Sequence, residues 1–208
     1  MEKLVESYKT LTFLLTQIFF FKEIHETFTD NEEKLNSIKF KGHYANQPFA
    51  KSISGNHLNY MILLANGYLD EYHDNFTAIK HPDYAERITE IKKLTKPVVK
   101  RIGKWTNLKD YRNNILAHNF RVKGQSIFAS DFEPIHLKAP HTNSEIMLLA
   151  ELLSIINTTI IQKIPGLLAG INFREPLFNK ITYEYIEVDI EKELNEIKVQ
   201  MLEIDKSI

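Results

Sequence analysis

Apolar residues recur at helical spacing through the N-terminal part of this chain. Residues 1–41 contain no Gly or Pro, and the polar segment 27–36 is expected to end a first helix. The apolar stripe of that helix consists of Leu4, Tyr8, Leu11, Leu15, Ile18 and Ile24. An irregular crossing is expected over 42–55, which contains Pro48, and a second helix with its own apolar positions is expected over 57–76.

A third helix is expected after Pro82. Proline suits the first turn of a helix, because the N–H that it lacks has no partner there. Along the segment that follows, one face carries the apolar residues Ile88, Ile91, Leu94, Val98, Ile102 and Trp105. Pro97 lies within this helix and is expected to kink or divide it.

Two further helices are separated by a long loop. The pattern predicts a fourth helix over 107–118 and a loop over 119–141, which is rich in turn-forming residues. A loop of this length inside a compact domain is often functional. Thr142 and Glu145 have the spacing of a capping box, in which each side chain bonds a free backbone N–H. The fifth helix therefore begins there and is expected to end near Pro165.

These elements predict an all-α bundle of about five helices over residues 1–166. Residues 167–208 are expected to form an acidic, partly helical C-terminal extension. The 208 residues are 43% hydrophobic and 25% charged, which is enough to bury a core without a disulfide or a metal. The chain has no Cys, which excludes thiol catalysis and Cys-ligated metals. No apolar run reaches about 20 residues, so no membrane span is expected. We therefore expect a cytoplasmic location.

Positive charge is concentrated in one part of the chain. Residues 85–124 hold eleven Lys and Arg against three acids, although the net charge of the protein is −1. The residues that step by three or four along the predicted third helix are Lys93, Lys96, Lys100 and Lys104. Such a ridge attracts polyanions, and RNA is the expected partner. The alternatives are an ordinary solvated helix face, or packing against the acidic segment 183–208, which has eight acids and three lysines.

Motifs for the common phosphate-binding and hydrolytic sites are missing. There is no GxxxxGK[ST], GxGxxG, GxSxG or HExxH, so neither a nucleotide cofactor nor a catalytic metal is expected. Two-metal helical bundles need a Glu-x-x-His on each of two helices together with two more carboxylates. Asp70 and His73 have this spacing on a helix, but Glu133 and His136 lie in the predicted loop. The set is incomplete.

The segment 111–119 carries the clearest candidate chemistry. Arg112 is followed directly by the polar Asn113, and His118 follows after five intervening residues. In this residue pattern and in its helical context the chain resembles the HEPN superfamily. The mark of that superfamily is an Arg that is followed, after four to six residues, by a His. The Arg-Asn-x-x-x-Ala-His sequence is similar to the bacterial branches associated with abortive infection and toxin–antitoxin systems.

This resemblance implies a metal-independent ribonuclease that acts as a homodimer. Arg112 would stabilise charge at phosphorus with its planar fork, and His118 would transfer the proton, since histidine is the side chain suited to proton transfer near neutral pH. Asn113 would orient one of them, with Tyr111 and Asn114 lining the site. The superfamily also includes non-catalytic modules. The alternative is therefore an RNA-binding or protein-interaction module that partners an antitoxin or a nucleotidyltransferase.

Helical geometry limits how a single chain could build this site. Six residues of an α-helix rotate by about 600°, which leaves Arg112 and His118 about 120° apart. Either the helix ends before His118, or two chains contribute to each site, in agreement with the composite dimer site that the resemblance implies. A purely structural interpretation also stays open, in which Arg112 pairs with Asp110 or with a carboxylate of the C-terminal segment.

Overall fold

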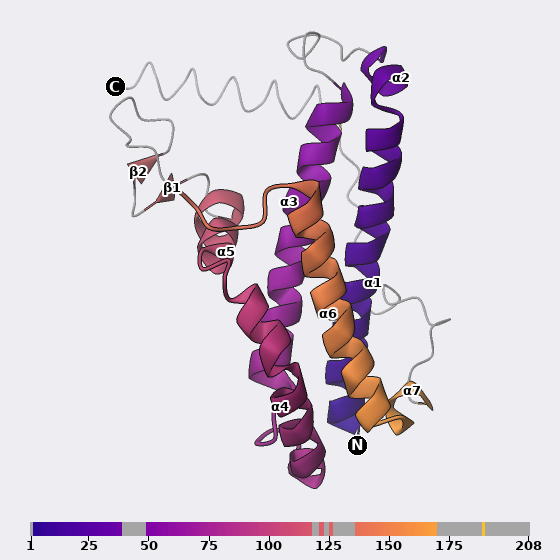
Figure 1. The fold of residues 1–208 in the computed structure, drawn as a ribbon, viewed down its shortest axis with the longest axis vertical. Helices are drawn as coiled ribbons and strands as arrows, with labels where there is room; N and C mark the ends of the chain where they lie inside the picture. The colour runs from indigo at the N-terminus through magenta and orange to yellow at the C-terminus, as the bar shows by residue number, and fades with distance from the viewer. Residues whose placement is uncertain are drawn as a thin grey trace. The chain divides into compact units, whose positions relative to one another are not determined.

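The computed structural model describes residues 2–38, 49–117, 121–122, 125–126, 136–169 and 189. Contacts divide the chain into the units Met1–Ile171 and Asn172–Ile208, whereas the sequence predicted a boundary after residue 166. In the first unit the long helices run side by side, which confirms the predicted all-α bundle (Figure 1). The main helices are α1 (Glu2–Asp30), α2 (Glu32–Asn36), α3 (Phe49–Asp70), α4 (Ala85–Ile102), α5 (Leu108–Asp110), α6 (Asn143–Lys163) and α7 (Gly166–Ala169).

The buried face of α1 follows the predicted stripe with one exception. Its core residues are Leu4, Tyr8, Leu11, Leu15 and Ile18. Beyond them the structure buries His25 and leaves Ile24 half-buried. Seven residues make nearly two full turns, so His25 lies on the same line as Ile18 while Ile24 is displaced. The His25 imidazole is accommodated because its Nε2 contacts Asn143 Oδ1 at the start of α6.

Helix α3 begins earlier than the sequence predicted. The expected irregular crossing over 42–55 is wrong for residues 49–55, which are helical, and residues 42–48 lie outside the described part of the chain. Gly55 sits inside the helix, where a Cβ would meet no atom within 4 Å. A single helical Gly costs only about 1 kcal/mol relative to Ala, so the helix continues through it.

At its C-terminal end α3 widens into a π-helical turn, η2 (Glu71–Asn75). The Phe76 N–H donates to the Glu71 carbonyl at 2.9 Å, which is the i→i+5 bond of this geometry. The sequence predicted a helix up to residue 76. The structure has a helical segment there, but its last turn is π-helical and not α-helical. Next in the chain, the 3₁₀ turn η3 (Pro82–Tyr84) leads directly into α4, so Pro82 opens the helical segment as predicted.

Helix α4 differs from its prediction at Pro97 and at Leu94. It runs unbroken through Pro97, so the proline does not divide it. The buried residues Ile88, Ile91, Thr95 and Ile102 fall within about 60° on the helix. Leu94 lies about 60° beyond that arc and is 51% exposed. The Thr95 hydroxyl can be buried, since it bonds the Tyr72 hydroxyl at 2.6 Å and donates to the Ile91 carbonyl at 2.8 Å.

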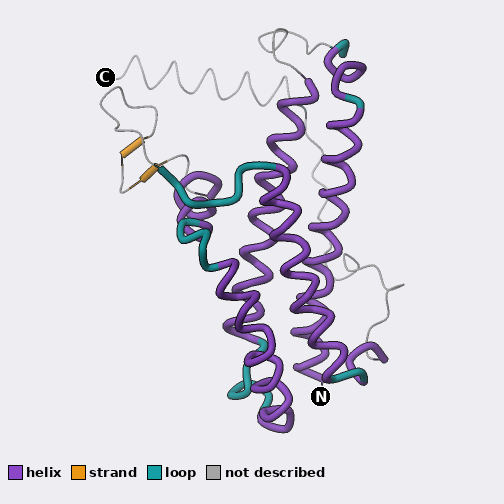
Figure 2. The backbone as a smooth tube through the Cα atoms, in the orientation of Figure 1, coloured by secondary structure: helices purple, strands orange, loops and turns teal. Residues whose placement is uncertain are grey.

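The predicted fourth helix is short and largely π-helical. Helix α5 continues into the π-helix η4 (Tyr111–Ala117), and His118 lies outside the described residues. Trp105, predicted on the third helix, is buried in the turn that follows α4. In the predicted loop, β1 (Arg121–Val122) pairs antiparallel with β2 (Gln125–Ser126), and Figure 2 shows these short strands next to the η4 turn.

Helix α6 supplies the largest share of the core. The capping box at its start is confirmed, with Glu145 N–H donating to Thr142 Oγ1 at 3.3 Å and Thr142 N–H donating to Glu145 Oε2 at 3.2 Å. The helix ends at Lys163, just before Pro165, as predicted. Among the described helices, α6 alone is long and apolar enough to cross a membrane. The core helix of a soluble protein can have the same length and composition. Helix α6 buries seven residues in the bundle.

Candidate nucleic-acid interface

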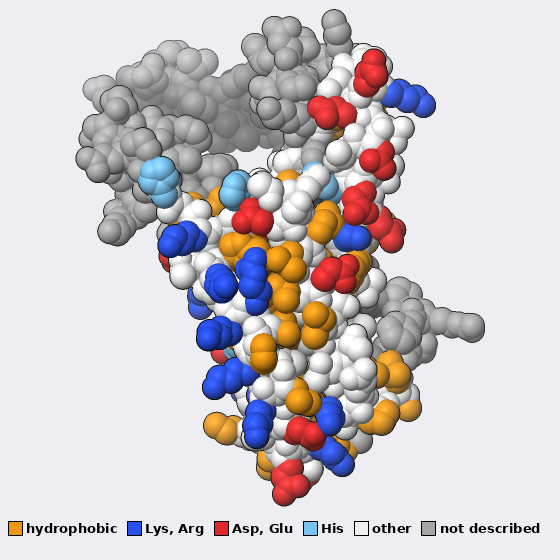
Figure 3. Space-filling view, viewed as in Figure 1, with side chains coloured by type: hydrophobic (Ala, Val, Ile, Leu, Met, Phe, Trp, Pro, Cys, Tyr) orange, Lys and Arg blue, Asp and Glu red, His pale blue; other side chains and the backbone are white. Residues whose placement is uncertain are grey.

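The four predicted lysines form an exposed row along α4 and the turn that follows it. Lys93, Lys96, Lys100 and Lys104 are all exposed, and the first three lie on the side of the helix opposite the buried stripe. None of the four forms an ion pair with another described residue. Figure 3 shows Lys and Arg side chains lined up along the side of the molecule on which α4 lies. We refer to these four residues as the lysine row.

Lys92 is a neighbour of the lysine row in sequence but faces the core. Its Nζ lies 3.3 Å from the centre of the Tyr72 ring and donates to the Tyr72 carbonyl. Burial lowers the pKa of Lys92 to about 8, with the carboxylate of Asp74 acting in the opposite direction. This lysine therefore joins α4 to η2 and is not available to a ligand on the exposed face.

Arg112 is held by two side chains. Its Nε donates to Asn113 Oδ1 at 2.9 Å, and its Nη1 forms an ion pair with Asp70, the last residue of α3. The side chains of Arg112 and Asp70 are 21% and 44% exposed, so the pair lies at the surface. The structural interpretation that Arg112 pairs with Asp110 is wrong, because Asp110 instead accepts from Asn107 Nδ2 at 3.1 Å.

A polar face of α3 positions the segment that carries Arg112. The Tyr111 hydroxyl donates to Asn59 Oδ1 at 3.0 Å. Nδ2 of the buried Asn66 lies 3.4 Å from the Leu108 carbonyl. Asn59, Asn66 and Asp70 are seven and four residues apart, so they share one side of the helix. Burial raises the pKa of Tyr111, which keeps its hydroxyl protonated as a donor.

The structure brings together only part of the predicted site. Arg112 and Asn113 are in direct contact, and Tyr111 lies beside them but points to α3. The side chain of Asn114 and all of His118 lie outside the described residues, so the geometry between Arg112 and His118 stays a prediction. Asp70 was missed as the partner of Arg112. A carboxylate at the end of a helix was visible in the sequence, but nothing there indicated which cation it would meet.

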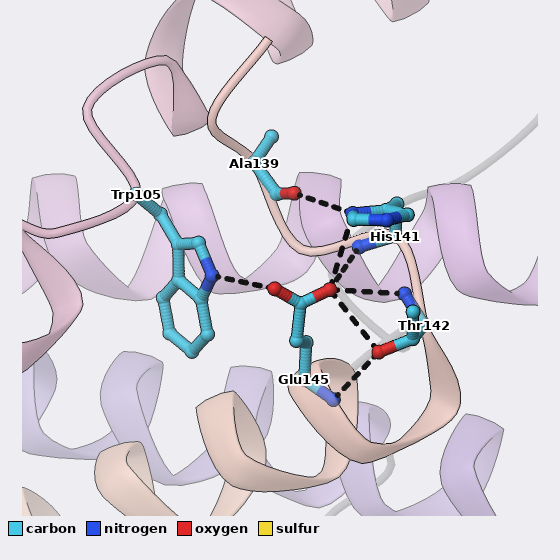
Figure 4. Close-up of polar contacts among 5 residues, drawn as sticks. All are labelled: Trp105, Ala139, His141, Thr142 and Glu145. Carbon is cyan, nitrogen blue, oxygen red and sulfur yellow. Dashed lines mark hydrogen bonds and ion pairs between the residues drawn. The ribbon is translucent and has the colours of Figure 1, made fainter.

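Glu145 organises a separate joint between the end of α4 and the start of α6 (Figure 4). Its Oε1 accepts from Trp105 Nε1 at 3.3 Å, and its Oε2 accepts from the backbone N–H of His141 and of Thr142, both at 3.2 Å. The His141 N–H contributes most to lowering the pKa of Glu145. The His141 ring, 3.1 Å from the same oxygen, belongs to this joint.

The described residues offer no metal-binding cluster. No group of three or more His, Asp or Glu side chains comes together within them. Asp70, part of the partial metal motif in the sequence, is paired with Arg112, and His73 is exposed beside the Tyr72 ring. Partial desolvation of the His73 ring beside its neighbours lowers its pKa, and the charge of Lys92 adds to this effect.

Comparison with known proteins adds no relative. No protein-family model matches the chain, and no curated protein and no solved structure shows significant similarity to it. The resemblance to the HEPN superfamily therefore stays a prediction from the residues of the Arg112 segment.

Proposed function

We propose that this protein binds RNA along the lysine row and cleaves it without a metal, as a HEPN-type ribonuclease in the bacterial cytoplasm. The observation that carries the proposal is the row itself: three exposed ammonium groups on one face of α4 and a fourth in the turn that follows it, with no ion-pair partner among the described residues. Phosphate neutralisation by such groups releases counterions and supplies most of the sequence-independent affinity for nucleic acids. The biological setting that we propose is defence or toxin–antitoxin growth control.

The proposed chemistry assigns one role to each residue of the motif. His118 transfers the proton: it leaves the 2′-OH as that oxygen attacks the adjacent phosphorus, and the 5′ oxygen gains a proton as its bond to phosphorus breaks. The products are a cyclic phosphate and a 5′-OH. Arg112 stabilises the charge that builds up on the phosphoryl oxygens. The bond from Arg112 Nε to Asn113 supports an orienting role for Asn113, because it fixes the plane of the guanidinium.

A second candidate function is a non-catalytic module, and the ion pair between Arg112 and Asp70 favours it. A carboxylate on the guanidinium satisfies Arg112 within the protein, as expected for a structural arginine. In that case the lysine row would bind RNA, or the acidic surface of an antitoxin or nucleotidyltransferase, without chemistry. Cleavage of RNA by the wild type separates the two candidates.

Replacing the four residues of the lysine row by Gln is expected to weaken RNA binding at least tenfold at low salt. It should also reduce the slope of log K against log salt by about 3, since each lost single-strand phosphate contact contributes roughly 0.7. Fluorescence anisotropy with single-stranded RNA over a salt series measures both. The control replaces four scattered exposed lysines: Lys3, Lys34, Lys80 and Lys138. An equal loss of affinity in the control would contradict a specific role for the row.

A composite site further predicts a homodimer. Two-fold symmetric dimers are the commonest oligomers, and each site would use Arg112 and His118 from both chains. Sedimentation equilibrium at micromolar concentration should report about 48 kDa, twice the 24.3 kDa of the chain. A monomer at all concentrations would exclude the composite site and leave only a site within one chain.

A further inference from the structure

Arg112 and Asp70 lie where two π-helical segments meet the bundle. Asp70 is the last residue of α3 and directly precedes η2, and Arg112 is the second residue of η4. Such wide turns occur often at functional sites, because they displace a side chain from the position that a regular helix would give it. The ion pair therefore connects two irregular segments at the surface.

A carboxylate and a phosphate compete for the same face of an arginine. The planar fork of the guanidinium binds either group through parallel N–H donors. In this structure Asp70 takes Nη1 of Arg112, while Asn113 takes Nε. A phosphate that binds Nη1 of Arg112 must replace the carboxylate of Asp70 there. Because Asp70 is 44% exposed, its carboxylate can return to water when it is displaced, without being left buried and unpaired.

We propose that Asp70 is a built-in competitor that occupies Arg112 until an RNA phosphate displaces it. This inference rests on the proposed function, since it concerns the same phosphate-binding arginine. The contact with Asn113 keeps Nε in place in both states, so the exchange involves only the Nη1 side of the fork. Asp70 then sets a threshold, since a phosphodiester gains the Nη1 side of Arg112 only by displacing this carboxylate.

Asp70→Asn tests the proposal, because it keeps the shape of the side chain and removes its charge. Affinity for single-stranded RNA at low salt is expected to rise about 3- to 10-fold, as expected from losing a partly exposed competing charge. Asp110→Asn is the matched control. It makes the same change of net charge at an exposed carboxylate that bonds Asn107, and it should change affinity by less than about twofold. Thermal melting checks that both variants remain folded.

Combining the substitution with Arg112→Gln identifies the group on which Asp70 acts. The gain from Asp70→Asn should disappear in that background, since no guanidinium is left to release. An equal gain in Asp110→Asn, or a persistent gain without Arg112, would show a general charge effect and overturn the proposal. A loss of affinity in Asp70→Asn would show that the carboxylate positions Arg112 and would also overturn it.

The outcome also separates this inference from the proposed function. If wild-type binding depends on the lysine row and Asp70→Asn does not tighten it, the RNA-binding function stands and the competitor role fails. If the wild type binds no RNA while Asp70→Asn does, the proposed RNA-binding function of the natural protein is overturned, and so is displacement of Asp70 by RNA. If neither protein binds RNA, both are overturned.

Discussion

Cleavage of RNA is expected to fall by about 10²- to 10⁴-fold when His118 is replaced by Ala. His118 is the proton-transfer group of the proposed reaction, and general acid–base catalysis contributes about this factor. Ala has no group that can accept or donate a proton, so it cannot replace His118 in this step. The rate is measured on a mixed RNA pool with EDTA present, so that contaminating metal-dependent nucleases are silent.

Arg112→Ala is expected to lower the rate by a comparable factor, about 10² to 10³. The guanidinium is the only permanent cation assigned to the phosphoryl oxygens, and the loss of one such donor costs this much in other enzymes. The ion pair with Asp70 is partly exposed, so its loss should lower the free energy of unfolding by only about 1 kcal/mol. A large loss of rate together with a small change in melting temperature is the expected signature of a catalytic residue.

One control variant and two contradicting outcomes complete this test. Lys109→Ala removes an exposed cation three residues from Arg112 and should leave the rate within about twofold. Cleavage that survives His118→Ala would point to another site or a contaminant. If the wild type cleaves nothing, and Arg112→Ala lowers the melting temperature strongly, the non-catalytic module becomes the better account of this segment.

The sequence predicted those features of the fold that depend on local spacing. The stripe on α1, the entry to the third helix at Pro82, and the capping box of Thr142 and Glu145 all follow from residues a few positions apart. A capping box needs only its own four residues, so it can be predicted without knowledge of distant contacts. Helical periodicity has the same local character, which is why the all-α class was predictable.

Features that depend on distant partners could not be predicted in this way. His25 and Thr95 are buried although the predicted stripes did not include them, because Asn143 and Tyr72 supply hydrogen bonds from other elements. The π-helical form of η4 has no known local signature in its sequence. It packs on a face of α3 defined by Asn59 and Asp70, whose polar residues read as ordinary surface positions until the two segments are placed together.

The candidate site shows the same division. Arg112 and Asn113 were found by motif, because their roles depend on adjacency in the chain. Asp70 is 42 residues away from Arg112 in sequence, and the choice between Asp70 and Asp110 as its partner depends on how η4 packs against α3. A charged pair across two helices is a property of the packed bundle, and only the structure identifies it.

Leu153→Ala is expected to lower the free energy of unfolding by about 2 to 5 kcal/mol. Leu153 is 0% exposed on α6, in the core that this helix shares with α1, α3 and α4. Removing its side chain loses the transfer free energy of three carbons and leaves a cavity that the surrounding helices can close only partly. The bond from the Tyr68 hydroxyl to the Leu153 carbonyl, at 3.3 Å, involves the backbone and survives the substitution.

The control is Ile155→Ala, two residues along the same helix at a side chain that is 50% exposed, which should change stability by about 0.5 kcal/mol or less. Urea denaturation measures both variants, and a lower midpoint with an unchanged m-value identifies a loss of stability in the native state. Equal effects at the two positions would mean that α6 does not bury the face on which Leu153 lies.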